Sequence, residues 1–135
     1  EMTANDAIAH VRAITEAHEG ADREALELVC GMAEKWASLP DGAEEVVVER
    51  LRQISAEGWS AEHDDAHQAG ELTSAAQSYI TSAFLGGFGV TPSCPPKIWP
   101  WDDSWWKPSS PLRDLAKAGA LLLAEMARIK RMGDG

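Results

Sequence analysis

Residues 62–71 concentrate side chains that can bind a metal ion or move a proton. These ten residues include two histidines, two aspartates and two glutamates. If residues 61–72 form one helix, His63, His67 and Glu71 lie at positions i, i+4 and i+8 on one face, with neighbours about 5–6 Å apart. Imidazole and carboxylate ligands together suit a borderline metal such as Zn²⁺, whereas Mg²⁺ and Mn²⁺ prefer carboxylates. The predicted ligands of a divalent metal are His63, Asp64, His67 and Glu71.

Two other interpretations of this cluster stay open. A hard ion such as Mg²⁺ would take Asp64, Asp65 and Glu71 as its ligands. Alternatively, the acids only favour the start of a helix through its dipole, and the histidines are surface or capping residues. If the site is catalytic, we expect Glu71 or His67 to act as the base when a metal-activated water attacks a phosphate.

A second candidate is the segment 86–111, which contains six of the seven prolines and four of the six tryptophans. Four tryptophans within eight residues must bury against something. They either clamp this segment onto the helices as a second small core, or some of them form a stacking wall for a base whose phosphates meet Lys97, Lys107 and Arg113. The predicted ligand-binding residues are Trp59, Trp101, Trp105, Trp106, Lys107, Arg113 and Lys117.

Charge and composition exclude several classes of partner. The chain of 135 residues has a net charge of −10, which argues against nonspecific binding to nucleic acid or to an anionic membrane. Residues 1–85 carry 17 acidic and 5 basic side chains, whereas residues 86–135 carry 5 acidic and 7 basic ones. An anionic ligand is therefore expected to approach the C-terminal part. Two isolated cysteines are typical of a reducing compartment, so we expect a cytoplasmic protein. The acidic N-terminus without an apolar run predicts no leader, and the lack of a long apolar segment predicts no membrane span.

Apolar spacing predicts helices nearly throughout, and therefore an all-α bundle of about five helices with one long Pro/Trp-rich loop. In the third helix we expect Val47, Leu51 and Ile54 to face inward. Residues 49–53 are expected to form mostly a solvated face, from which Arg50 or Gln53 could point at the acidic cluster. Residues 1–135 are expected to form one domain, with residues 1–42 as a variable helical pair and residues 43–135 as the core. The expected helices run from Asn5 to His18, 23 to 39, Ala43 to Glu57, Ala61 or Ala66 to Leu85, and Pro111 over about 20 residues.

The same motifs resemble a family of small proteins common in bacteriophages and prophages. The resemblance covers residues 49–131 and leaves residues 1–48 outside it. It implies that the chain belongs to this family and is encoded by a phage or prophage. A protein of that origin is expected in the cytoplasm of the host cell. The motifs that carry the resemblance are Glu49-Arg50, Arg52-Gln53, Glu57-Gly58-Trp59, Glu62-His63-Asp64-Asp65, His67, Gly70-Glu71-Leu72, Ala75-Ala76, Trp99-Pro100-Trp101, Trp105-Trp106-Lys107-Pro108, Arg113-Asp114-Leu115 and Lys117-Ala118-Gly119-Ala120-Leu121.

A weaker similarity is to the MazG-like all-α nucleotide pyrophosphohydrolases. Gly70-Glu71-Leu72 resembles their Gly-Glu-Leu segment, and Asp114 or Glu125 matches a later acidic motif. Ser74 stands where the second glutamate of their Glu-x-x-Glu pair is expected. The similarity implies Mg²⁺-dependent cleavage of a nucleoside triphosphate to monophosphate and pyrophosphate.

These observations lead us to expect a phage-type nucleotide-binding protein, with divalent-metal-dependent nucleotide hydrolysis as one activity. The alternative is a non-enzymatic phage accessory or counter-defence protein that sequesters a nucleotide signal or occludes a host protein. Because short helices need a partner surface and two-fold symmetry is the commonest assembly, we expect a homodimer.

Overall fold

The computed structural model describes residues 3–17 and 20–133 of the chain. It divides into two compact units, Glu1–Asp41 and Gly42–Gly135. Each unit is described on its own, and the single domain expected from the sequence stays a prediction. Throughout the described residues the regular structure is helical, with six α-helices and one short 3₁₀ helix and no strand, which confirms the all-α fold.

The first unit is a pair of packed helices, α1 (Ala4–Glu16) and α2 (Ala21–Ala37). The expected end of the first helix at His18 lies outside the described residues. Cys30 is buried in this unit, with its sulfur 4.0 Å from the carbonyl oxygen of Ile8, and is a free thiol. It therefore acts as a small core residue, as its apolar surroundings in the sequence indicated.

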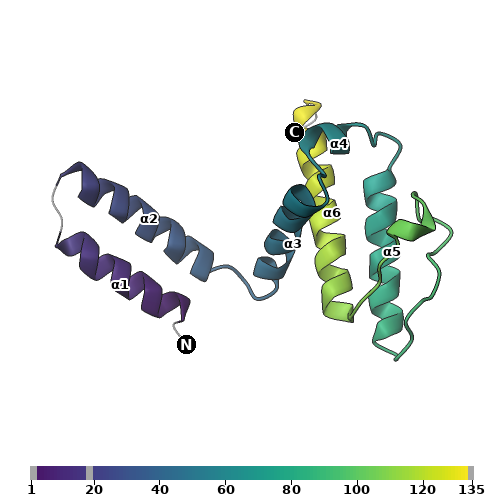
Figure 1. Ribbon diagram of the computed structural model, residues 1–135, viewed down its shortest axis with the longest axis horizontal. Helices are drawn as coiled ribbons and strands as arrows, with labels where there is room; N and C mark the ends of the chain where they lie inside the picture. The colour runs from purple at the N-terminus through teal and green to yellow at the C-terminus, as the bar shows by residue number, and fades with distance from the viewer. Residues whose placement is uncertain (1–2, 18–19, 134–135) are drawn as a thin grey trace. The chain divides into compact units, whose positions relative to one another are not determined.

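The second unit is built around its last helix. It contains α3 (Ala43–Ala56), α4 (Ala61–Asp65), α5 (Glu71–Gly86), the 3₁₀ helix η1 (Asp103–Trp105) and α6 (Pro111–Arg131). Helix α6 packs against α3, α4 and α5, and lies between α3 and α5 in Figure 1. Ser110 caps α6 by accepting a hydrogen bond from the backbone N–H of Arg113, as expected for Ser before Pro. None of the helices described has the length and apolar character needed to cross a bilayer.

Small residues allow α6 to approach two helices at once. A Cβ atom at Gly119 would lie 2.8 Å from a methyl carbon of Val46 on α3, so no larger residue fits without moving that side chain. Leu121 and four alanines of α6 are buried, and several of these pack in the core shared with α5. The buried alanines are Ala116, Ala118, Ala120 and Ala124.

The prediction of a continuous helix over residues 61–72 is wrong. Helix α4 ends at Asp65, and α5 starts at Glu71 after a turn. Gly70 has a φ of 85°, a left-handed conformation that interrupts a right-handed helix and suits glycine. The Glu71 carboxylate accepts a hydrogen bond of 2.8 Å from the backbone N–H of Ala69. Glu71 therefore closes the turn and does not follow His67 on one helical face.

Helix α3 buries a polar face, which contradicts the expected inward positions. Leu51 is 59% exposed and Ile54 is 43% exposed, whereas Glu49 and Gln53 are 1% and 2% exposed. The reason is a set of ion pairs centred on Glu49, described below, which the apolar periodicity of the helix does not reveal. Within the stretch 49–53 that was predicted to face solvent, Glu49 and Gln53 are therefore buried, whereas Leu51 is exposed.

The segment between α5 and α6 is anchored by aromatic side chains. Trp99 and Trp106 are buried against Tyr79 of α5, with ring centroids 5.6 and 4.9 Å from that of Tyr79. The two tryptophan rings lie 5.1 Å apart. Part of the Trp-rich segment thus packs into the core that α5 and α6 share and does not form a separate second core, and Trp101 packs partly buried against it.

Candidate functional site

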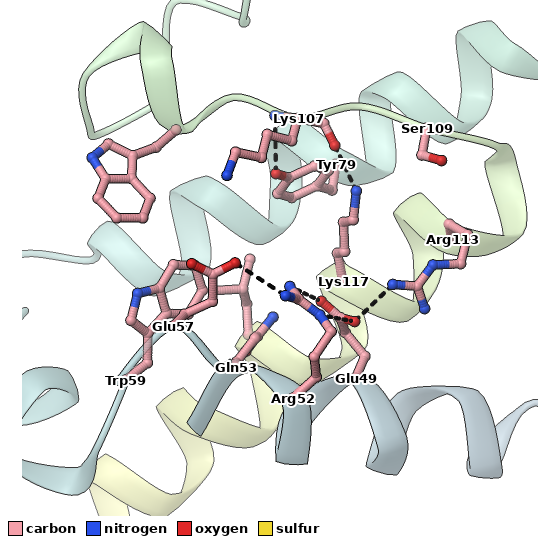
Figure 2. A pocket seen from close by; sticks show the side chains of 12 residues that line it. Glu49, Arg52, Gln53, Glu57, Trp59, Tyr79, Lys107, Ser109, Arg113 and Lys117 are labelled. Atoms are coloured by element: carbon pink, nitrogen blue, oxygen red, sulfur yellow. Dashed lines mark hydrogen bonds and ion pairs between the residues drawn. The ribbon is translucent and has the colours of Figure 1, made fainter. Parts of the chain in front are cut away.

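A cavity of about 400 Å³ opens between α3, α6 and the Trp-rich segment. Helix α3 contributes Glu49, Arg52 and Gln53, and α6 contributes Arg113 and Lys117, as Figure 2 shows. We call it the cationic cavity because four basic side chains face two acidic ones. Its other lining residues are Glu57, Trp59, Tyr79, Trp105, Lys107, Ser109 and Leu121.

Glu49 organises two arginines at this cavity. Its carboxylate accepts two hydrogen bonds of 2.9 Å from Arg52, through Nε and Nη2, and one of 2.8 Å from Nη2 of Arg113. Burial alone would raise the pKa of Glu49, but the hydrogen bonds from Arg52 and Arg113 outweigh it and hold the pKa below its usual value. Glu49 therefore stays ionised and ties α3 to α6 at this point.

Arg113 keeps hydrogen-bonding capacity for a ligand. A guanidinium has five N–H donors, and within the described residues the side chain of Arg113 uses one of them, for Glu49. Its side chain is 42% exposed, so the group reaches the open part of the cavity. A planar fork of this kind suits the oxygens of a phosphate or carboxylate.

Two lysines complete the positive side of the cavity. Lys117 donates a hydrogen bond of 2.5 Å from Nζ to the backbone carbonyl of Lys107 and lies 5.3 Å from the ring centroid of Tyr79. Burial lowers the pKa of Lys117, and the carboxylate of Asp114 acts in the opposite direction. Lys107 places its ammonium 5.8 Å from the ring centroid of Trp105. Burial also raises the pKa of Tyr79 to about 12, so its hydroxyl stays protonated at neutral pH.

An aromatic cavity of about 380 Å³ adjoins the cationic one. Trp59 stacks on His63 with ring centroids 5.6 Å apart and an angle of 3° between the planes. Trp101 lies 5.7 Å from Trp59, and Trp105 lies 6.5 Å from it. Besides these aromatic side chains the cavity is lined by Glu57, His67 and Asp102. Glu57, Trp59 and Trp105 line both cavities, so the two spaces share one wall.

The histidines of the acidic cluster face each other at the edge of the aromatic cavity. Nε2 of His63 lies 3.4 Å from Nε2 of His67, and Nδ1 of His63 lies 3.1 Å from Oδ1 of Asp64. Asp64 is fully buried and also accepts a hydrogen bond of 2.5 Å from Arg50. A carboxylate accepts hydrogen bonds only, so the contact with Asp64 places a proton on Nδ1 of His63, and in the neutral imidazole this leaves Nε2 as the nitrogen with the lone pair.

The structure separates the predicted metal ligands. His63 and His67 converge, whereas Asp64 contacts Arg50 and His63, and Glu71 bonds to the turn before α5. In the part of the chain that is described, no group of three or more His, Cys, Asp and Glu side chains is arranged to hold a metal ion.

The predicted ligand-binding residues are mostly brought together. Trp59, Trp105, Lys107, Arg113 and Lys117 line the cationic cavity, and Trp59, Trp101 and Trp105 line the aromatic one. Trp106 lies in the core beside Tyr79 and lines neither of these two cavities. Of the two residues proposed as a base, His67 faces the aromatic cavity and Glu71 faces the turn.

The sequence indicated part of the contribution of α3. Of the two residues expected to point at the acidic cluster, Arg50 bonds to Asp64 and Gln53 lines the cationic cavity. Glu49, Arg52 and Glu57 were not singled out as site residues. Glu49, Arg52, Gln53 and Glu57 recur at spacings of three, one and four, so they follow one side of a helix. This polar stripe was present in the sequence, but charged stripes usually face solvent. Tyr79 and Ser109 also line the cavity, and nothing in their sequence context indicated it.

No family model, curated protein or solved structure matches this chain. The resemblance to phage proteins and the weaker one to the MazG-like hydrolases therefore stay predictions.

Proposed function

We propose that this chain binds a nucleotide across the two adjoining cavities, with the base in the aromatic cavity and the phosphates in the cationic one. The observation that carries the proposal is the shared wall: Trp59 and Trp105 face both an aromatic space and a space lined by four basic side chains. A nucleotide presents the same two chemistries, a flat ring and an anion, joined by a sugar.

The distribution of charge supports this assignment. The chain has 22 acidic and 12 basic residues, yet four of the basic ones line a single cavity. Positive charge gathered in a cleft of an acidic protein attracts a small anion without favouring a polyanion over the whole surface. Stacking of a base on tryptophan contributes about 1–3 kcal/mol and tolerates different bases.

Geometry favours binding, and hence sequestration of a nucleotide signal, over metal-assisted hydrolysis. Cleavage of a phosphoanhydride with Mg²⁺ needs carboxylates that are available to hold the ion. The carboxylates lining the cationic cavity are Glu49 and Glu57, and both accept hydrogen bonds from Arg52. The acids matched to the MazG-like motifs are engaged too, because Asp114 bonds to Ser82 and Glu125 to Arg128.

Titration of the protein with AMP, GMP, CMP, UMP and their triphosphates, with and without Mg²⁺, tests the proposal through tryptophan fluorescence. We expect saturable quenching, since Trp59, Trp101 and Trp105 line the base cavity. Arg113→Ala should weaken binding about tenfold or more, because hydrogen bonds to charged groups contribute about 1.5–3 kcal/mol. Lys97→Ala is the matched control, since Lys97 is an exposed base that lines neither cavity.

The outcomes of this titration are distinct. Equal losses in Arg113→Ala and Lys97→Ala would assign the attraction to general charge and not to the cavity. No saturable signal with any nucleotide at millimolar concentration would refute nucleotide binding. Release of pyrophosphate or phosphate during the titration would favour the hydrolase over sequestration.

We also propose that the histidine pair binds a divalent metal of the Zn²⁺ type. Zn–N bonds of about 2.0–2.1 Å in a tetrahedral site bring two ligating nitrogens roughly 3.3–3.4 Å apart. The Nε2 atoms of His63 and His67 are 3.4 Å apart, and Asp64 holds the other ring nitrogen of His63, as carboxylates do behind metal-bound histidines.

Zn²⁺ is therefore expected to raise the melting temperature, as any ligand of the native state does. His67→Ala should abolish the rise, because it removes one of the two nitrogens. His10→Ala is the control, since His10 lies exposed on α1. A melting temperature that does not respond to Zn²⁺ up to millimolar concentration would leave the pair as a hydrogen-bonded part of the cavity wall.

The homodimer expected from the sequence is likewise a proposal. Apolar side chains left exposed on the second unit, among them Val48 and Leu51 of α3 and Leu115 and Met126 of α6, support it. Burying such side chains against a second copy would remove apolar surface from water, which favours association.

A further inference from the structure

Glu57 is the acidic residue that lines both cavities and therefore borders the place where they meet. We infer that the ligand is a ribonucleotide whose ribose hydroxyls donate hydrogen bonds to the Glu57 carboxylate. The inference rests on the proposed function and adds the class of sugar. The sugar joins the base to the phosphates, so it lies where the two cavities meet when the base fills the aromatic cavity and the phosphates fill the cationic one.

Two features fix the position of Glu57, its place in the backbone and a hydrogen bond from Arg52. Glu57 follows the last residue of α3, and the chain then turns at Gly58, which has a φ of 71°. Its Oε1 accepts a hydrogen bond of 3.0 Å from Nη1 of Arg52. The Nε and Nη2 atoms of the same guanidinium donate hydrogen bonds to the buried Glu49. Figure 2 shows the Glu57 carboxylate beside Trp59 and directed towards Arg52. The carboxylate is thus pre-positioned and does not need to be ordered by a ligand.

The chemistry of a carboxylate at this place limits what it can contact. An ionised carboxylate accepts hydrogen bonds and repels phosphate, so the phosphates must lie towards Lys107, Arg113 and Lys117. The neutral donors of a nucleotide near the junction of base and phosphate are its ribose hydroxyls. Acidic side chains use the same contact to hold the ribose of dinucleotides. The Glu57 side chain is 22% exposed, so it is partly open to the cavities.

The experiment compares ribonucleotides with their 2′-deoxy forms. We would measure dissociation constants of AMP and dAMP, GMP and dGMP, CMP and dCMP, and UMP and dUMP by calorimetry. The ribonucleotide that binds most tightly should bind about tenfold or more tightly than its 2′-deoxy form, because one charge-assisted hydrogen bond is lost. Glu57→Ala should bring this ratio close to one. Glu62→Ala, which removes an exposed acid outside both cavities, should leave the ratio unchanged.

Each outcome separates this inference from the proposed function. Binding of both forms with equal affinity would overturn the role of Glu57 and leave nucleotide binding intact. Absence of binding by all eight monophosphates, and by the triphosphates of the fluorescence titration, would overturn both. If Glu57→Ala weakens AMP and dAMP by the same factor, Glu57 acts only by positioning Arg52, or contacts the base, and the assignment to the ribose is wrong.

Discussion

Replacing Trp106 by alanine is expected to lower the free energy of unfolding by about 3–5 kcal/mol, the usual cost of truncating a large buried aromatic side chain. Trp106 is 8% exposed and packs against both Tyr79 and Trp99, with ring centroids 4.9 and 5.1 Å away. Its removal leaves a cavity in the core that anchors the Trp-rich segment. Urea denaturation followed by circular dichroism measures the change.

Trp105 is the matched control, because it is the next residue back in the chain and has the same side chain. It is 46% exposed and lines both cavities, so Trp105→Ala should reduce stability by only about 1–2 kcal/mol. The same variant should weaken nucleotide binding by about 1–3 kcal/mol through lost stacking. Equal stability losses in the two variants, with nucleotide affinity unchanged in Trp105→Ala, would show that both tryptophans are structural.

Asp64→Asn is expected to be the second large destabilisation, of about 3–5 kcal/mol. Asp64 has no exposed surface, and it accepts hydrogen bonds from Arg50 and from the ring of His63. The amide keeps the shape of the carboxylate but not its charge, so the partly buried Arg50 is left without its counter-ion. Nη1 of Arg50 is already buried without a hydrogen-bond partner among the described residues, which increases the cost.

Asp65→Asn separates this effect from a general loss of negative charge. Asp65 also pairs with an arginine, Arg131, at 2.7 Å, but both side chains are at least one-third exposed. Exposed ion pairs contribute about 0–1 kcal/mol, so the neighbouring substitution should change stability little. Similar losses in the two variants would mean that burial does not decide the strength of the Arg50–Asp64 pair.

The helical fold follows from the sequence because its signals are local. Ser110-Pro111 marks the start of α6, and the segment Gly86-Gly87 marks the end of α5. The break between α4 and α5 was missed because spacing alone made His63, His67 and Glu71 look like one helical face. Gly70, in a left-handed conformation, overrides that pattern.

The candidate site was predicted only in part, because its organisation depends on contacts between distant residues. Lys107, Arg113 and Lys117 were expected from the charge of the C-terminal part. Glu49 was not, because burial of a carboxylate depends on Arg113, which lies 64 residues away. The tryptophans had two interpretations, and packing against Tyr79 separates them: Trp106 joins the core, while Trp105 faces the cavities.

The close approach of α3 and α6 at Gly119 has a bearing on how such a site can change in evolution. Val46, which touches the space above Gly119, lies one helical turn from Glu49, and Glu49 is bonded across to Arg113 of α6. A bulkier residue at position 119 would move α3 and α6 apart and lengthen the hydrogen bond between Glu49 and Arg113. The width of the cationic cavity therefore depends on Gly119, which does not line the cavity. A substitution at this position could change that width without altering any side chain that a ligand contacts.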